Sequence, residues 1–126
     1  MVYDGMHVET TERIITGAIE VHRHLGPGLL EAVYEEALCV ELRGSGLAFK
    51  RQIGVPLYYK GHPVSEHRPD LIVDDVVIVE IKSVDRLHSI HTAQMLTYLR
   101  VTGKRVGLLL NFNSVVMRQG IRRLVI

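Results

Sequence analysis

Apolar side chains recur at helical spacing over the first third of the chain. In residues 9–25 they lie three or four positions apart, as one buried face of a helix requires, and a similar stripe runs over residues 29–43. Gly26, Pro27 and Gly28 separate the two segments, because proline cannot continue a helix and glycine accepts the left-handed backbone that ends one. The chain therefore begins with two helices.

The pattern then changes to strands. Three strands are predicted, over residues 49–59, 64–73 and 76–83. Gly54 and Pro56 interrupt the first, which is expected to form either one strand or two short pieces. Asp74 and Asp75 lie in a tight turn between the second and the third. Residues 76–79 are all apolar, so the third strand is expected at the centre of a sheet, buried on both faces.

One helix and two further strands complete the chain. The helix is predicted over 86–102 and ends at Gly103, a buried strand follows over 106–112, and a more exposed strand covers 115–126. A meander followed by a crossover helix predicts a mixed central sheet flanked by helices, in the α/β or α+β class.

Length and composition indicate one domain over residues 1–126. The chain is 47% hydrophobic and 23% charged, as folded globular proteins are. Its apolar runs are shorter than the ~18–20 residues of a membrane span, and its first residues lack a signal-peptide pattern, so we expect no membrane segment and a cytoplasmic location. The single cysteine, Cys39, excludes an internal disulfide and a metal site made of cysteines alone.

The net charge of +1 hides an uneven distribution. Residues 1–41 contain eight acidic and two basic side chains, whereas residues 86–126 contain seven basic and no acidic ones. This predicts a positive surface in the C-terminal third that binds an anion, with nucleic acid the commonest large one. Alternatively, the two regions neutralise each other within the domain or across a dimer.

Asp70, Glu80 and Lys82 form the most informative group of charged residues. Glu80 and Lys82 are two apart on one strand and project from the same face. If the turn is centred on Asp75, Asp70 falls opposite Glu80 with Cβ atoms ~4.5–5.5 Å apart. A strictly two-residue turn would instead place the two carboxylates on opposite faces. The other alternative is an ordinary surface ion pair with Lys82.

Two carboxylates so close together repel each other unless a cation lies between them. Hard oxygen ligands favour Mg²⁺ or Mn²⁺, and the Ile81 carbonyl could supply a further ligand. Such an ion activates water and neutralises charge on a phosphate, while Lys82 orients the nucleophile or stabilises the transition state.

The order Pro69-Asp70 followed by Glu80-Ile81-Lys82 resembles the signature of the PD-(D/E)XK nuclease superfamily. Residues 28–34 also resemble the motif of the small bacterial GxxExxY proteins, which are assigned to that superfamily. The resemblance covers nearly the whole chain. It implies a restriction-endonuclease-like αβββαβ core and metal-dependent phosphodiester hydrolysis, with Asp70 and Glu80 as metal ligands and Lys82 as the catalytic lysine.

The resemblance also implies supporting residues. Glu31, in the GxxExxY segment, is the candidate third carboxylate of the metal site, or else an acid that stabilises a helix N-terminus. Gln94 and Tyr98 share a helix face and resemble a Gln-x-x-x-Tyr element that arranges the active site and bound strand in related repair nucleases. Tyr98 could equally be a buried core tyrosine.

The first hypothesis is therefore a metal-dependent nuclease acting on nucleic acid, with DNA favoured over RNA. Four basic residues are expected to hold the phosphate backbone: Arg86, Arg100, Lys104 and Arg105. A chain this small offers little separate recognition surface, so weak specificity or a homodimer is expected. The alternatives are a catalytically inactive nucleic-acid-binding or protein-interaction module on the same fold, or a scaffold that binds no nucleic acid. Glu35 and Glu36 are expected to be ordinary solvated acids.

Overall fold

The computed structural model describes residues 5–126. Residues 1–4, on which the signal-peptide expectation partly rests, lie outside the described residues. The elements follow in this order: α1 (Val8–Leu25), α2 (Glu31–Gly44), β1 (Phe49–Arg51), β2 (Val55–Tyr59), β3 (His62–His67), β4 (Leu71–Val73), β5 (Val77–Lys82), α3 (Ser89–Thr102), β6 (Val106–Asn111), the 3₁₀ turn η1 (Met117–Gly120) and β7 (Ile121–Val125).

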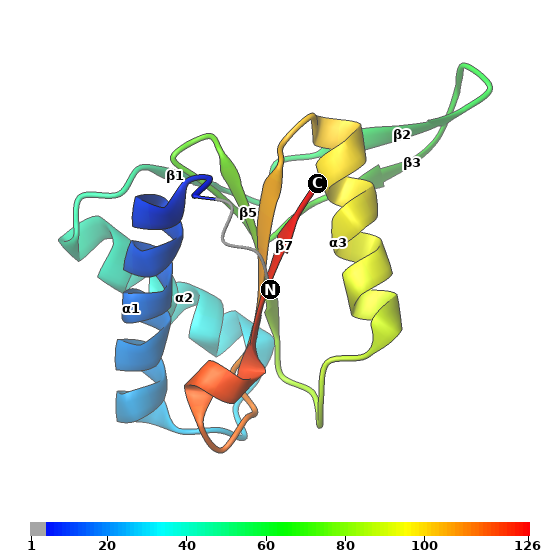
Figure 1. The fold of residues 1–126 in the computed structure, drawn as a ribbon. Helices are drawn as coiled ribbons and strands as arrows, with labels where there is room; N and C mark the ends of the chain where they lie inside the picture. The colour runs from blue at the N-terminus through cyan, green and yellow to red at the C-terminus, as the bar shows by residue number, and fades with distance from the viewer. Residues whose placement is uncertain (1–4) are drawn as a thin grey trace.

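Five strands form the central sheet in the order β1-β4-β5-β6-β7. All neighbours are antiparallel except β5 and β6, which run parallel and are joined by α3. Helices α1 and α2 cover one face of this sheet and α3 covers the other (Figure 1). The predicted mixed sheet flanked by helices is confirmed, as is the central position of β5.

The sheet separates two apolar layers. Leu71, Val79 and Leu108 point toward α1 and α2, where the larger core lies. Ile78 and Leu109 point the other way and pack with α3. Every residue of β5 up to Ile81 is buried, as an apolar strand covered on both faces must be.

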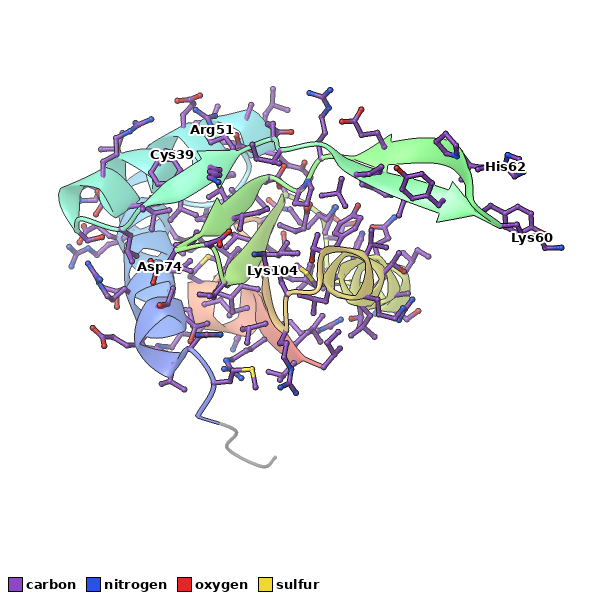
Figure 2. The ribbon with its side chains drawn as sticks, turned by 90° about the horizontal axis from the view of Figure 1, so that it is seen from above. Cys39, Arg51, Lys60, His62, Asp74 and Lys104 are labelled. Carbon is purple, nitrogen blue, oxygen red and sulfur yellow. The ribbon has the colours of Figure 1, made fainter. Side chains whose placement is uncertain are left out.

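The predicted strand over 64–73 is wrong as one element. Its first part belongs to β3, which pairs with β2 in a separate two-stranded ribbon, and its last part is β4 of the central sheet. Pro69 lies between them and has no N–H to donate to a strand ladder. The ribbon projects from the body of the molecule, with Lys60 and His62 at its tip (Figure 2).

The last predicted strand, over 115–126, begins later than expected. The chain first makes η1, which buries Met117, and β7 then starts at Ile121. Gly120 ends this turn so close to the β6 strand end that an added Cβ would lie 2.3 Å from the Asn111 carbonyl oxygen. Helix α3 also starts later, at Ser89 rather than at residue 86.

No helix within residues 5–126 combines the length and the apolar character that crossing a membrane requires.

Candidate active site

The turn between β4 and β5 aligns the two candidate carboxylates. Val73 pairs with Val77, so residues 74–76 form a three-residue loop, and Asp74 and Asp75 adopt the left-handed backbone that this turn needs. The same register, continued beyond Leu71 and Val79, sets Asp70 opposite Glu80. The loop centred on Asp75 is therefore the one that the structure adopts.

Each carboxylate accepts a hydrogen bond from the opposite strand. The Asp70 N–H donates to Glu80 Oε1 at 3.2 Å, and the Ile81 N–H donates to Asp70 Oδ2 at 2.7 Å. These bonds replace the backbone ladder just before β4 begins. Ile72 and Ile78 pack against α3, and residues two apart share a face, so Asp70, Glu80 and Lys82 lie on the α3 face of the sheet.

Burial and charge act strongly on Glu80, whose side chain is only 7% exposed. Burial, followed by the charge of the Asp70 carboxylate, raises the pKa of Glu80 to about 8, although Lys82 and the hydrogen bond from the Asp70 N–H act in the opposite direction. Such a carboxylate ionises readily only when more positive charge is placed beside it.

The donor set fits a hard divalent cation. Asp70 and Glu80 supply two carboxylates that face each other across the strands, and the neighbouring Ile81 has a backbone carbonyl. Within residues 5–126, no three His, Cys, Asp or Glu side chains come close enough together to hold a metal by themselves. Two carboxylates, a carbonyl and water are thus the ligands available.

Glu31, the first residue of α2, lies near enough for its charge to act on Glu80, but it does not complete a three-carboxylate cluster within residues 5–126. Its charge adds to the raised pKa of Glu80, as the weakest of the contributions. The preceding loop is anchored at two points: the Tyr34 hydroxyl donates to the Gly26 carbonyl at 2.6 Å, and the Ser83 hydroxyl donates to the Leu29 carbonyl at 2.6 Å. The segment of residues 28–34 is thereby held with the start of α2 beside Ser83, the residue that follows Lys82. Glu31 as a direct metal ligand stays a prediction.

Helix α3 brings Tyr98 to the carboxylates. The Tyr98 side chain is 9% exposed, and its hydroxyl lies 3.1 Å from His67 Nδ1. Burial, followed by the charges of Glu80 and Asp70, raises the pKa of Tyr98 to about 12. Tyr98 is therefore both a core residue and a neighbour of the site, and its hydroxyl stays protonated.

Gln94 precedes Tyr98 by one helical turn and is exposed. Its side chain makes no hydrogen bond to any of the residues that the structure describes, so it is available to a ligand. His91, one turn earlier, has its pKa lowered by burial and next by Lys82, which places its ring near that ammonium group.

Glu35 is not the solvated acid that was expected. It is 8% exposed, accepts two hydrogen bonds from Arg51 at 3.0 and 2.7 Å, and accepts one from Gln52 Nε2 at 3.1 Å. Gln52 Nε2 also lies 3.3 Å from Asp70 Oδ1. Glu36, by contrast, is exposed, although it too pairs with Arg51. A chain of hydrogen-bonded polar groups, of which Glu35 is the buried member, thus links α2 to Asp70 through Gln52.

Sequence reasoning missed Gln52, Glu35 and His67 as parts of this site. Gln52 has a left-handed backbone and donates its own N–H to the Asp70 carbonyl at 3.2 Å. A polar residue between β1 and β2, where the pattern breaks, was the only signal. His67 carried none, because its contact with Tyr98 joins positions far apart in the chain.

The four predicted backbone-binding bases do not gather in one place. Arg86 lies in the loop that follows Lys82, near the site. Lys104 pairs with Asp75 at 3.2 Å, and Arg105 donates to the Ile126 carbonyl, both at the end where β5 begins. That end is roughly 16 Å from Lys82 at ~3.3 Å per residue. Arg100 lies near the C-terminal end of α3, exposed.

Comparison with known proteins gives one finding. A protein-family model described as the PD-(D/E)XK nuclease superfamily matches residues 8–124, which is nearly the whole chain. No curated protein and no solved structure matches the chain.

Proposed function

Because this chain belongs to the PD-(D/E)XK nuclease superfamily, we propose that it is a metal-dependent nuclease that hydrolyses phosphodiester bonds of nucleic acid, with DNA favoured over RNA. The observation that carries the proposal is the hydrogen-bonded pair of Asp70 and Glu80, with Lys82 on the same face of the sheet. These are the residues at the positions of the superfamily's signature.

Asp70, Glu80 and the Ile81 carbonyl would hold Mg²⁺ or Mn²⁺. When bound, such an ion acidifies a water molecule and neutralises charge on the phosphate. The charge of Glu31 also acts on Glu80 and so strengthens the attraction of the site for a cation. Gln52 and the Ile81 N–H keep the Asp70 carboxylate oriented, since each of its oxygens has a donor within 3.3 Å.

Lys82 is the catalytic residue in this proposal. Hydrolysis joins a water oxygen to phosphorus and breaks the bond to the leaving sugar oxygen, while negative charge builds on the other phosphate oxygens. The Lys82 ammonium, two positions from Glu80, stabilises that charge and orients the attacking water. Gln94 and Tyr98, from α3, line the side from which the strand would approach, and Gln94 is free to bind it.

Arg86 is the base best placed to contact the phosphate backbone next to the cut, because it follows Lys82 closely in the chain. Contacts by Arg100, Lys104 and Arg105 would require a substrate long enough to pass around α3 to the far end of the sheet. Membership of the GxxExxY group, a cytoplasmic location and a homodimer remain predictions.

A cleavage assay tests the proposal. Labelled single- and double-stranded DNA and RNA are incubated with Mn²⁺, with Mg²⁺ and with chelator. We expect cleavage of DNA with either ion and none with chelator. Lys82→Ala and Asp70→Asn should each lower the rate by at least about a hundredfold, since a positioned electrostatic group is worth ~10²–10³ in rate. Lys104→Ala, at the far end of the sheet, serves as the matched control and should cut a short substrate like the parent, because only a longer one could reach Lys104.

Two results would overturn the assignment. Cleavage by Lys82→Ala at the parental rate would remove Lys82 from the chemistry. Binding of nucleic acid that weakens steeply with salt, with no cleavage under any divalent ion, would instead identify an inactive binding module.

A further inference from the structure

A cavity of about 440 Å³ opens beside the candidate active site, at the end of the sheet where β5 and β6 finish. The loop after β5 forms one wall, and the segment from the end of β6 through η1 to the start of β7 forms the other. Both segments lie at this same end of the sheet in Figure 1. In α/β proteins the carboxyl ends of parallel strands are the usual place for a ligand.

The walls are held in place by side-chain hydrogen bonds. The Asn111 amide is 1% exposed; it accepts from the Val84 N–H at 3.1 Å and donates to the Val84 carbonyl at 2.9 Å, so it joins the two walls. His22 Nε2 lies 2.7 Å from the Ser114 carbonyl and ties the second wall to α1. Gly120 packs so closely within this wall that an added Cβ would lie 2.3 Å from both the Asn111 carbonyl oxygen and the Ser114 hydroxyl.

The lining combines three kinds of chemistry. Arg86 and Arg122 supply positive charge, and Arg122 Nη1 is oriented by a 2.6 Å hydrogen bond to Thr92 of α3. Asn113 and Gln119 supply amides that both donate and accept hydrogen bonds. Asp85 supplies a carboxylate, which repels a bare anion but accepts from N–H or O–H groups. The matching ligand carries an anionic group together with hydrogen-bond donors, and a nucleotide has both.

The cavity adjoins the catalytic residues. Lys82 pairs with Asn111, which lines the cavity, and the chain passes from Lys82 directly into its first wall. Glu80 pairs with Leu109 and Leu109 pairs with Arg122, so Arg122 lies two strands from Glu80. At ~4.8 Å between strands this separation is about 10 Å. A span of this length places the cavity about one nucleotide away from the site along a bound strand.

We propose that this cavity binds one nucleotide of the substrate strand next to the bond that is cut. Its phosphate contacts Arg86 and Arg122, and its base or sugar contacts Asn113, Gln119 and Asp85. The inference rests on the proposed nuclease function and deepens it, because a nucleotide seated in a cavity must be unpaired from a complementary strand. The preferred substrate is thus single-stranded nucleic acid or a strand end.

Binding without metal tests the inference separately from cleavage. Deoxyadenosine 5′-monophosphate and a six-nucleotide single-stranded DNA are titrated into the protein in chelator and followed by NMR, with fluorescence anisotropy for the labelled oligonucleotide. We expect dAMP to shift the side-chain amide signals of Asn113 and Gln119, and the oligonucleotide to displace it. Arg122→Gln and Arg86→Gln should each weaken binding about tenfold.

Arg118→Gln is the matched control, since Arg118 is exposed on η1 and does not line the cavity. It makes the same change in charge and should bind like the parent. Arg86 is exposed, so Arg86→Gln remains informative if Arg122→Gln fails to fold. Equal weakening by the Arg86 and Arg118 variants would overturn the inference, as would dAMP shifts confined to other residues or failure of the oligonucleotide to displace dAMP. If the parent cleaves nucleic acid but neither dAMP nor the oligonucleotide binds in the cavity, the cavity inference is wrong and the proposed nuclease function stands.

Discussion

Glu80 makes the stability of the metal-free protein depend on pH in an unusual direction. Its pKa is raised from 4.5 to about 8 in the folded protein, whereas in the unfolded chain it ionises near the ordinary value. Between these two values the native state binds more protons than the unfolded state, so the free energy of unfolding falls as pH rises. The stabilisation that depends on a protonated Glu80 is fully present below pH 4.5 and is lost as the pH rises through about 8.

The size of this effect follows from the shift. At ~1.4 kcal/mol per pKa unit, the full loss approaches about 5 kcal/mol, and about 3 kcal/mol of it has accrued by pH 7. Glu80 is only 7% exposed, so water does little to screen its interactions. Glu80→Gln keeps an oxygen that accepts from the Asp70 N–H and cannot ionise. We expect this variant to match the parent near pH 4.5 and to be more stable by about 3 kcal/mol at pH 7.

Urea unfolding at several pH values between 4.5 and 8.5, in chelator, measures this difference. All other ionisable groups are common to both proteins, so the difference between parent and variant isolates Glu80. Glu12→Gln, at an exposed carboxylate on α1 that takes no part in the site, is the control and should follow the parent. Added Mn²⁺ should restore stability to the parent at pH 7 and have little effect on Glu80→Gln. Parallel pH curves for the parent and Glu80→Gln would refute the reasoning.

Three further substitutions test the supporting structure. Glu35→Ala should lower the free energy of unfolding by about 2–3 kcal/mol in urea melts, because it removes a largely buried carboxylate that accepts three hydrogen bonds. The exposed Glu36→Ala should change it little, and equal losses would contradict this role of Glu35. Gly107→Ala should lower the free energy of unfolding by about 1–3 kcal/mol by overpacking, since the new Cβ would lie 2.4 Å from Met95 Sδ. An unchanged thermal midpoint would show that α3 packs less closely against β6. Tyr34→Phe should lower the free energy of unfolding by only about 1 kcal/mol but clearly reduce the cleavage rate, because the Tyr34 hydroxyl anchors the loop before α2. Thermal melts and cleavage assays on the same protein measure the two effects, and full activity would argue against that role.

The secondary structure was largely predictable from the sequence. The two amino-terminal helices, their separation at Gly26-Pro27-Gly28 and the buried strands β5 and β6 follow from local periodicity and from residues that end helices. The division of residues 64–73 between two sheets was not predictable in this way. Apolar and polar alternation marks a strand but does not say which strand it pairs with, and that choice depends on contacts distant in the chain.

The candidate site shows the same division. The identity and order of Asp70, Glu80 and Lys82 are properties of the sequence, and they sufficed to predict an acidic pair beside a lysine. The sequence left two turn geometries open, one of which would have separated the carboxylates. The left-handed backbone at Asp74 and Asp75 and the pairing of Val73 with Val77 place both on one face.

The sequence by itself thus determined which chemical groups are present and which local elements carry them. The tertiary structure decided their environment: the burial of Glu35, the contact of His67 with Tyr98, and the separation of Lys104 and Arg105 from the site. The physical reason is that periodicity and turn chemistry act between near neighbours in the chain. Register, burial and the electrostatic surroundings of a side chain arise only when distant segments pack together.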